Sequence, residues 1–142
     1  MSQRYWDDVR EGEALAGFSM DVTMTRMVLQ VSGTQDFYPI HHDRDFAREG
    51  GHADIFLNTG FLRAVLCRLV ADWAGDDGFV KRIAFQMRRP HLLGDTISVK
   101  GRVTGRRQED GHGAVDLDVW VENPRDGAAT PGTATVYLPR RG

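Results

Sequence analysis

The 142-residue sequence has a single cysteine, Cys67, and only two lysines, Lys81 and Lys100. One cysteine excludes an internal disulfide framework and a cysteine-based metal site. No stretch approaches the roughly 18 uninterrupted apolar residues that a membrane-spanning helix needs. The first residues also lack the apolar core of a signal peptide. These absences predict a cytoplasmic protein that does not enter a membrane.

An excess of positive charge is also missing, because the formal net charge is −2. This balance argues against a general binder of nucleic acids or other polyanions. The other sixteen basic residues are all arginines, whose planar guanidinium suits phosphate and carboxylate, although a GC-rich genome gives the same bias. His52, His91 and His112 have no partners at ligand spacing, so a zinc site is not expected.

The length fits one domain, and its longest regular element is a helix that begins after Asn58 and ends at Gly75. Its apolar residues recur at intervals of three and four, which predicts a central buried helix. Thr25 is the expected N-cap of an earlier short helix that Gly33 ends, and residues 44–49 form another short helix or turn. Strands are expected over 14–23, 79–89, 96–106, 114–122 and 133–138.

One long helix followed by antiparallel strands predicts an α+β fold in which the sheet curls around the helix. A single sheet of this size leaves one edge and one face underprotected. We therefore expect the strands to join a second copy, or a related subunit, in a larger sheet, with a site at that seam.

The stretch from Asp36 to Asp43, Asp-Phe-Tyr-Pro-Ile-His-His-Asp, places an acid and an imidazole five residues apart. Pro39 fixes its own φ and pushes Tyr38 toward an extended conformation, so the loop is stiff. Asp36 and His41 can then face one point and share a water molecule as a general acid and base. Taken singly, Asp36 is an ordinary turn cap and His41 an ordinary core histidine; their combination with Pro39 favours catalysis.

The pattern Asp36-x-x-Pro39-Ile40-His41-x-Asp43, followed by the helix after Asn58 and by Pro90…Gly94-Asp95-Thr96, resembles the MaoC-like (R)-specific enoyl-CoA hydratases. This resemblance implies a single hot-dog domain over residues 1–142. It also implies a trans-2-enoyl thioester of coenzyme A as substrate, Asp36 and His41 as the water-activating dyad, and no metal or redox cofactor.

The resemblance also assigns the backbone N–H groups of Thr59 or Gly60 to the thioester oxyanion, at the positive end of the helix. Arg88, Arg89 and Lys81 become candidates for the phosphates of coenzyme A, although a solvated strand edge is the more ordinary assignment for the two arginines. The sequence departs from the family pattern where Tyr38 replaces an asparagine and where Thr59 replaces the usual oxyanion glycine.

Within the family, the chain also resembles the small subunit of heteromeric hydratases that act on steroid side-chain enoyl-CoA thioesters. Its runs His41-His42-Asp43-Arg44-Asp45, Asp54–Asn58 and Asp72–Gly75 carry this likeness. It implies a hetero-oligomer with a second MaoC-like subunit, with a homodimer as the alternative.

Two other functions remain open because a fold alone does not decide activity. One is a hot-dog acyl-CoA thioesterase, which would release free thiol. The other is a non-catalytic subunit that shapes a partner's acyl tunnel, although such a subunit has no reason to keep both Asp36 and His41.

Overall fold

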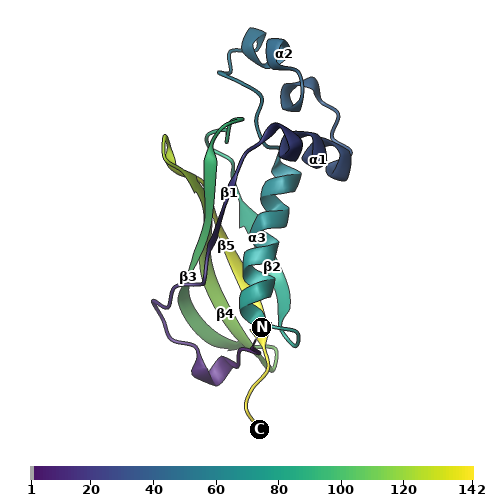
Figure 1. Ribbon diagram of the computed structural model, residues 1–142. Coiled ribbons are helices and arrows are strands. Elements are labelled where there is room, and N and C mark those ends of the chain that lie inside the picture. The colour runs from purple at the N-terminus through teal and green to yellow at the C-terminus, as the bar shows by residue number, and fades with distance from the viewer. Residues whose placement is uncertain (1) are drawn as a thin grey trace.

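The computed structural model describes residues 2–142 and consists of one long helix held against a curled, five-stranded antiparallel sheet (Figure 1). The strand order is β1-β3-β4-β5-β2, so β1 and β2 form the two edges. This is the α+β hot-dog arrangement that the sequence predicts. The strands are β1 Phe18–Asp21, β2 Phe79–Phe85, β3 Thr96–Glu109, β4 His112–Asn123 and β5 Gly127–Leu138.

The central helix α3, Thr59–Ala74, begins and ends where its capping residues predict. The side chain of Asn58 accepts a hydrogen bond from the Phe61 N–H, and Gly75 ends the helix with a φ of 83°. The apolar stripe of α3 is buried, with Leu62, Leu66 and Val70 fully inaccessible to solvent. At about 25 cal/mol per Å² of buried apolar surface, this stripe makes a large contribution to the stability of the fold.

The inner face of the sheet supplies the other half of this core. In β4, Val115, Leu117, Val119 and Val121 are buried against α3, whereas the residues between them face outward. This alternation confirms the period-two pattern of the sequence. No helix among residues 2–142 is long and apolar enough to cross a membrane.

Several strand limits differ from expectation: β1 covers only part of the predicted 14–23, and β3 and β4 extend beyond the predicted 96–106 and 114–122. β2 ends at Phe85 rather than at residue 89, and β5 begins at Gly127 rather than at residue 133. Pro131, which lies between the strands predicted at 114–122 and 133–138, is within β5 as the partner of Trp120. A short turn at residues 124–126 therefore replaces the connection expected over residues 123–132.

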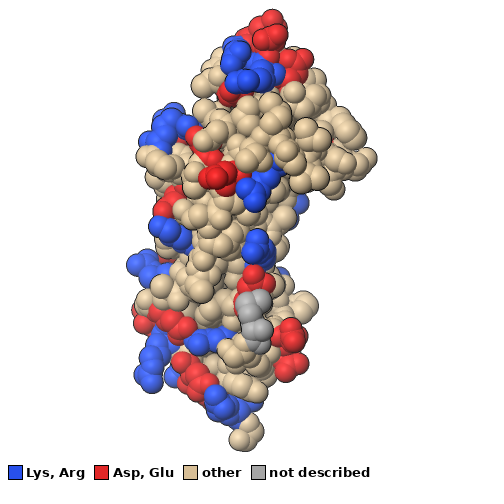
Figure 2. All heavy atoms as spheres, in the orientation of Figure 1, with Lys and Arg blue, Asp and Glu red and all other residues tan. Residues whose placement is uncertain are grey.

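The segment between β1 and α3 projects beyond the sheet at the amino end of α3 (Figure 1) and contains α1, Met24–Thr34, and α2, Arg44–Glu49. Thr23, not Thr25, caps α1, and the helix continues through Gly33. Val28, Leu29 and Phe37 of this segment are exposed apolar side chains. Figure 2 shows that the visible face of the projection beside α1 carries few charged side chains.

Candidate active site

Asp36 and His41 approach each other in the connection between α1 and α2. Gln35 adopts a left-handed conformation, with a φ of 56°, and turns the chain at the end of α1. Pro39 then opens a short 3₁₀ turn, Pro39–His41, after an extended Tyr38. As a result, Nε2 of His41 lies 3.4 Å from Oδ2 of Asp36.

A backbone carbonyl sets the proton position on His41. The Nδ1 atom of the ring lies 2.8 Å from the carbonyl oxygen of Phe56. Because a carbonyl can only accept, Nδ1 carries the proton and donates it to this bond. In the neutral ring, Nε2 is then an unprotonated acceptor that faces the Asp36 carboxylate.

Two hydrogen-bond acceptors that lie 3.4 Å apart are stabilised by a donor that binds both of them. A water molecule can do so because it has two hydrogens to donate. The His41 side chain is 9% exposed and that of Asp36 is 42% exposed, so a small molecule can reach the pair from the Asp36 side. The arrangement suits the activation of a water molecule by general acid–base chemistry.

The amino end of α3 is coupled to this pair through Thr34. The side-chain amide of Asn58 donates to Oγ1 of Thr34 over 2.8 Å, and the Asp36 N–H donates to the same hydroxyl over 3.4 Å. A Cβ on Gly60 would lie 3.0 Å from the Thr34 methyl group. The first turn of α3 therefore packs directly against the residue that supports Asp36.

The backbone N–H groups of Thr59 and Gly60 lie in the first turn of α3, where a helix offers no internal acceptors. The helix dipole adds partial positive charge at this end. The position suits an oxygen that gains negative charge.

The residues that follow His41 hold the loop in place. Asp43 caps α2 by accepting a hydrogen bond from the Phe46 N–H over 3.1 Å. Arg44 makes two hydrogen bonds to Asp54, of 3.0 and 2.7 Å. The hydrogen bond from Arg44 lowers the pKa of the Asp54 carboxyl, and the two residues fasten α2 to the chain leading to Phe56.

The structure does not bring Lys81 to this pair. Its ammonium group is 2.6 Å from Oε2 of Glu109 and lies over the Tyr137 ring. Lys81 is near the start of β2, which follows the carboxyl end of α3. It is therefore about one helix length, roughly 24 Å at 1.5 Å per residue, from the amino end.

Arg88 and Arg89 are exposed in the segment that follows β2, and the N–H groups of both donate to the carbonyl of Ala129. This segment continues to Leu92, which forms a bridge with Phe56 next to His41.

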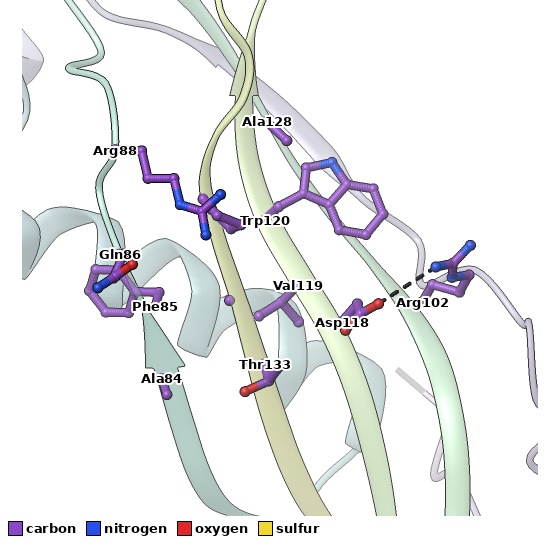
Figure 3. A pocket seen from close by; sticks show the side chains of 12 residues that line it. Ala84, Phe85, Gln86, Arg88, Arg102, Asp118, Val119, Trp120, Ala128 and Thr133 are labelled. Atoms are coloured by element: carbon purple, nitrogen blue, oxygen red, sulfur yellow. Dashed lines mark ion pairs between the residues drawn. The ribbon is translucent and has the colours of Figure 1, made fainter.

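The Arg88 side chain extends across β5 toward Trp120, on the sheet face away from α3 (Figure 3). It lines a hollow of about 620 Å³ there, together with Arg102, which is paired with Asp118. This hollow is separate from the Asp36–His41 pair, so the candidate site is identified by its hydrogen bonds and not by the size of a cavity.

Sequence analysis missed the residues that support the pair, namely Gln30, Thr34 and the Phe56 carbonyl. One signal was present in the sequence, because Gln30 shares the buried face of α1 with Met27 and Val31. A glutamine on an apolar helix face needs hydrogen-bond partners. The Phe56 carbonyl gave no signal because every residue has one.

A family model described as a MaoC like domain matches residues 12–123. The chain is 38% identical over 80 residues to the beta subunit of a 3-oxo-4,17-pregnadiene-20-carboxyl-CoA hydratase from Mycobacterium tuberculosis. That match covers 56% of this chain and 62% of the relative, so the chain spans less than two thirds of its length.

Solved structures show the same fold. A chain in the crystal structure of the ChsH1-ChsH2 complex from Mycobacterium tuberculosis has a TM-score of 0.82 and 29% identity, covering 92% of this chain and 98% of that one. The R-hydratase PhaJ1 from Pseudomonas aeruginosa has a TM-score of 0.84 and 17% identity, covering 96% and 86% of the two chains.

Proposed function

The chain belongs to the MaoC-like domain family, and from that premise we propose that it adds water to, or removes water from, a trans-2-enoyl thioester of coenzyme A. The observation that carries this proposal is the Asp36–His41 pair. Nε2 of His41 lies 3.4 Å from Oδ2 of Asp36, and its Nδ1 is held on the Phe56 carbonyl. Both groups that face the substrate are thus acceptors for the two hydrogens of one water molecule.

In the hydration direction, this water donates one hydrogen to Nε2 of His41 and the other to the Asp36 carboxylate. One of the two groups removes a proton while the other orients the water, whose oxygen then forms a bond to the β-carbon. The electron pair of the double bond moves onto the thioester as an enolate. The proton returns to the α-carbon on the same face, so the dyad ends the cycle as it began.

The enolate oxygen is assigned to the N–H groups of Thr59 or Gly60. These donors have no acceptor within the helix, and the helix dipole favours negative charge at this end. Only a backbone N–H is needed, so a threonine in place of the family's glycine does not remove the donor. Loss of one such donor costs about 10²–10³ in rate in other enzymes.

The phosphates of coenzyme A are assigned to Arg88 and Arg89, whose segment leads to Leu92, the bridge partner of Phe56. Guanidinium groups suit phosphate oxygens because they donate in pairs. Lys81 lies near the carboxyl end of α3. It can bind the phosphates only of a thioester that extends to that end, from this site or from the site of a neighbouring subunit. The reaction itself requires no metal or redox cofactor.

We further propose that the chain acts together with a second MaoC-like subunit, with a steroid side-chain thioester as the acyl substrate and with a homodimer as the alternative assembly. Its likeness to a hydratase beta subunit and to a chain of a two-protein complex supports this assignment. The exposed apolar side chains of Val28, Leu29 and Phe37 also support it, because such surfaces are usually covered by a partner or a ligand.

The test is an assay of enoyl-CoA hydration, followed through loss of the conjugated thioester absorbance, with the chain alone and with a candidate partner. Short, long and ring-bearing acyl groups are compared. Asp36→Asn should keep its fold and lose about 10²–10⁴ of the rate, because the amide no longer accepts a proton. The matched control is Asp76→Asn, at an exposed aspartate in the turn after α3.

Full turnover by Asp36→Asn would contradict the dyad assignment. Release of free thiol from a saturated acyl-CoA would indicate a thioesterase instead. Hydration that requires the partner but is unaffected by Asp36→Asn would assign this chain a non-catalytic role.

A further inference from the structure

Gln30 connects the two halves of the candidate site through its side-chain amide. Its Oε1 atom accepts a hydrogen bond from the Asn58 N–H over 2.8 Å, and its Nε2 atom donates to the Phe56 carbonyl over 3.3 Å. The side chain is only 3% exposed. One buried amide thus binds the backbone on both sides of Leu57, immediately before α3 begins.

The carbonyl bound by Gln30 is the one that holds His41. The Phe56 oxygen therefore accepts two hydrogen bonds, one from Nε2 of Gln30 and one from Nδ1 of His41. A carbonyl has two lone pairs, so both bonds can form at once. The second donor restrains the direction of the carbonyl and so keeps its other lone pair aimed at the ring.

The other end of the same amide holds the residue that precedes the proposed oxyanion donors. Asn58 is 1% exposed and caps α3, and the next two N–H groups belong to Thr59 and Gly60. Any shift of the Gln30 amide would change the distance between the His41 ring and this helix end. A misplacement of about 1 Å in such a constellation can cost 10²-fold in rate.

We propose that Gln30 is a positioning residue, which fixes the proton of His41 on Nδ1 and sets the spacing between the ring and the first turn of α3. Its effect on turnover rests on the hydration proposed above, whereas its effect on the His41 ring does not. Helix stability alone does not require it, because a leucine or methionine would pack beside Met27 and Val31 without a buried polar group.

The decisive variant is Gln30→Met, which keeps an unbranched side chain of similar length but neither donates nor accepts these two hydrogen bonds. The matched control is Gln3→Met, at the opposite end of α3. There the Gln3 amide donates to the Ala74 carbonyl over 2.9 Å and accepts from the Asp77 N–H over 2.8 Å. Both variants therefore lose a glutamine that joins two backbone groups at one end of the same helix.

Two measurements separate positioning from simple support of the fold. The first is kcat and KM for enoyl-CoA hydration. Gln30→Met should lower kcat by about 10- to 100-fold with a smaller change in KM. Gln3→Met should leave kcat unchanged. The second is a long-range ¹H–¹⁵N spectrum of the histidine rings at about pH 8.5, above the ordinary histidine pKa. The unmodified chain should show His41 protonated at Nδ1, and Gln30→Met should show a mixture of the two neutral forms.

A His41 ring protonated mainly at Nε2 in the unmodified chain would overturn the proposal, even if Gln30→Met does not fold. An unchanged ring spectrum in a folded Gln30→Met variant would overturn it as well. If no enoyl thioester is hydrated with or without a partner, the proposed function fails, and the ring spectra still decide the role of Gln30.

Discussion

Two buried histidines lie on either side of the chain that leads into α3, and they differ in what surrounds their second nitrogen. His41 donates through Nδ1 to the Phe56 carbonyl and turns Nε2 toward a half-exposed carboxylate. His91 is completely buried, with Nδ1 3.0 Å from the amide nitrogen of Asn123 and Nε2 2.9 Å from the Thr130 hydroxyl.

The difference teaches how a functional histidine is separated from a structural one. Both nitrogens of His91 are satisfied by neutral groups, so no atom remains to take a proton from a substrate. In His41 one nitrogen is anchored and the other is available, which is the arrangement that acid–base chemistry requires. Burial alone does not distinguish the two residues.

The largest effect is expected from His41→Ala, which removes the ring that receives the proton. Hydration should fall by about 10²–10⁴-fold, with a small change in the free energy of unfolding because the site opens to solvent at Asp36. Turnover of enoyl-CoA and urea unfolding are measured together. His112→Ala, at the exposed first residue of β4, is the control and should keep both values. A His41→Ala variant as active as this control would remove the distinction between the two buried histidines.

His91→Ala should have the opposite effect, with a large loss of stability and little loss of turnover. It leaves a cavity and deprives Asn123 and Thr130 of their partner, so the free energy of unfolding should fall by about 2–4 kcal/mol. The turnover of the fraction that remains folded should be close to that of the unmodified chain. Urea unfolding and turnover at a temperature well below the transition are the measurements. A strong loss of turnover without loss of stability would place His91 in the chemistry.

The smallest effect concerns pH. Burial lowers the pKa of His91 below its ordinary value of 6.5. Below pH 6.5 the unfolded chain binds a proton at this residue that the folded chain does not, so the free energy of unfolding falls as the pH falls toward the folded-state pKa. Above pH 6.5 both states are neutral and this contribution is constant. The slope due to this residue is at most about 1.4 kcal/mol per pH unit.

The His91→Gln variant tests this prediction because a neutral amide can occupy the site without titrating. The temperature of thermal unfolding, measured between about pH 7 and pH 5, should depend less on pH in this variant than in the unmodified chain. His112→Gln, at an exposed position, is the control. An unchanged pH dependence in His91→Gln would show that His91 is not the group responsible.

Much of the fold could be predicted from the sequence because its signals are local. The limits of α3 follow from Asn58 and Gly75, and the inward face of β4 follows from the alternation that begins at Val115. The end of β2 and the start of β5 could not be predicted in this way, because Pro131 resembles a loop residue until its partner strand is known. A strand boundary depends on the neighbouring strand as well as on its own residues.

The candidate site likewise has one part that the sequence predicted and another part that it did not. The spacing of Asp36, Pro39 and His41 is a property of six consecutive residues, and it predicted a stiff loop that holds two reactive groups. Its supports come from far along the chain. The Phe56 carbonyl is 15 residues from His41, and the bonds of Gln30 to residues 56 and 58 cross separations of 26 and 28 residues.

The sequence by itself determined the central helix and the identity of the acid and the imidazole, since each depends on neighbours within a turn or a short loop, and its resemblance to the MaoC-like hydratases implied the hot-dog class. Only the tertiary structure decided which ring nitrogen of His41 is available and how near the pair lies to the start of α3. Those features require α1, the loop and the segment before α3 to pack together. The hydrogen bonds between them form only when that packing excludes water, because the buried polar groups then have only protein partners.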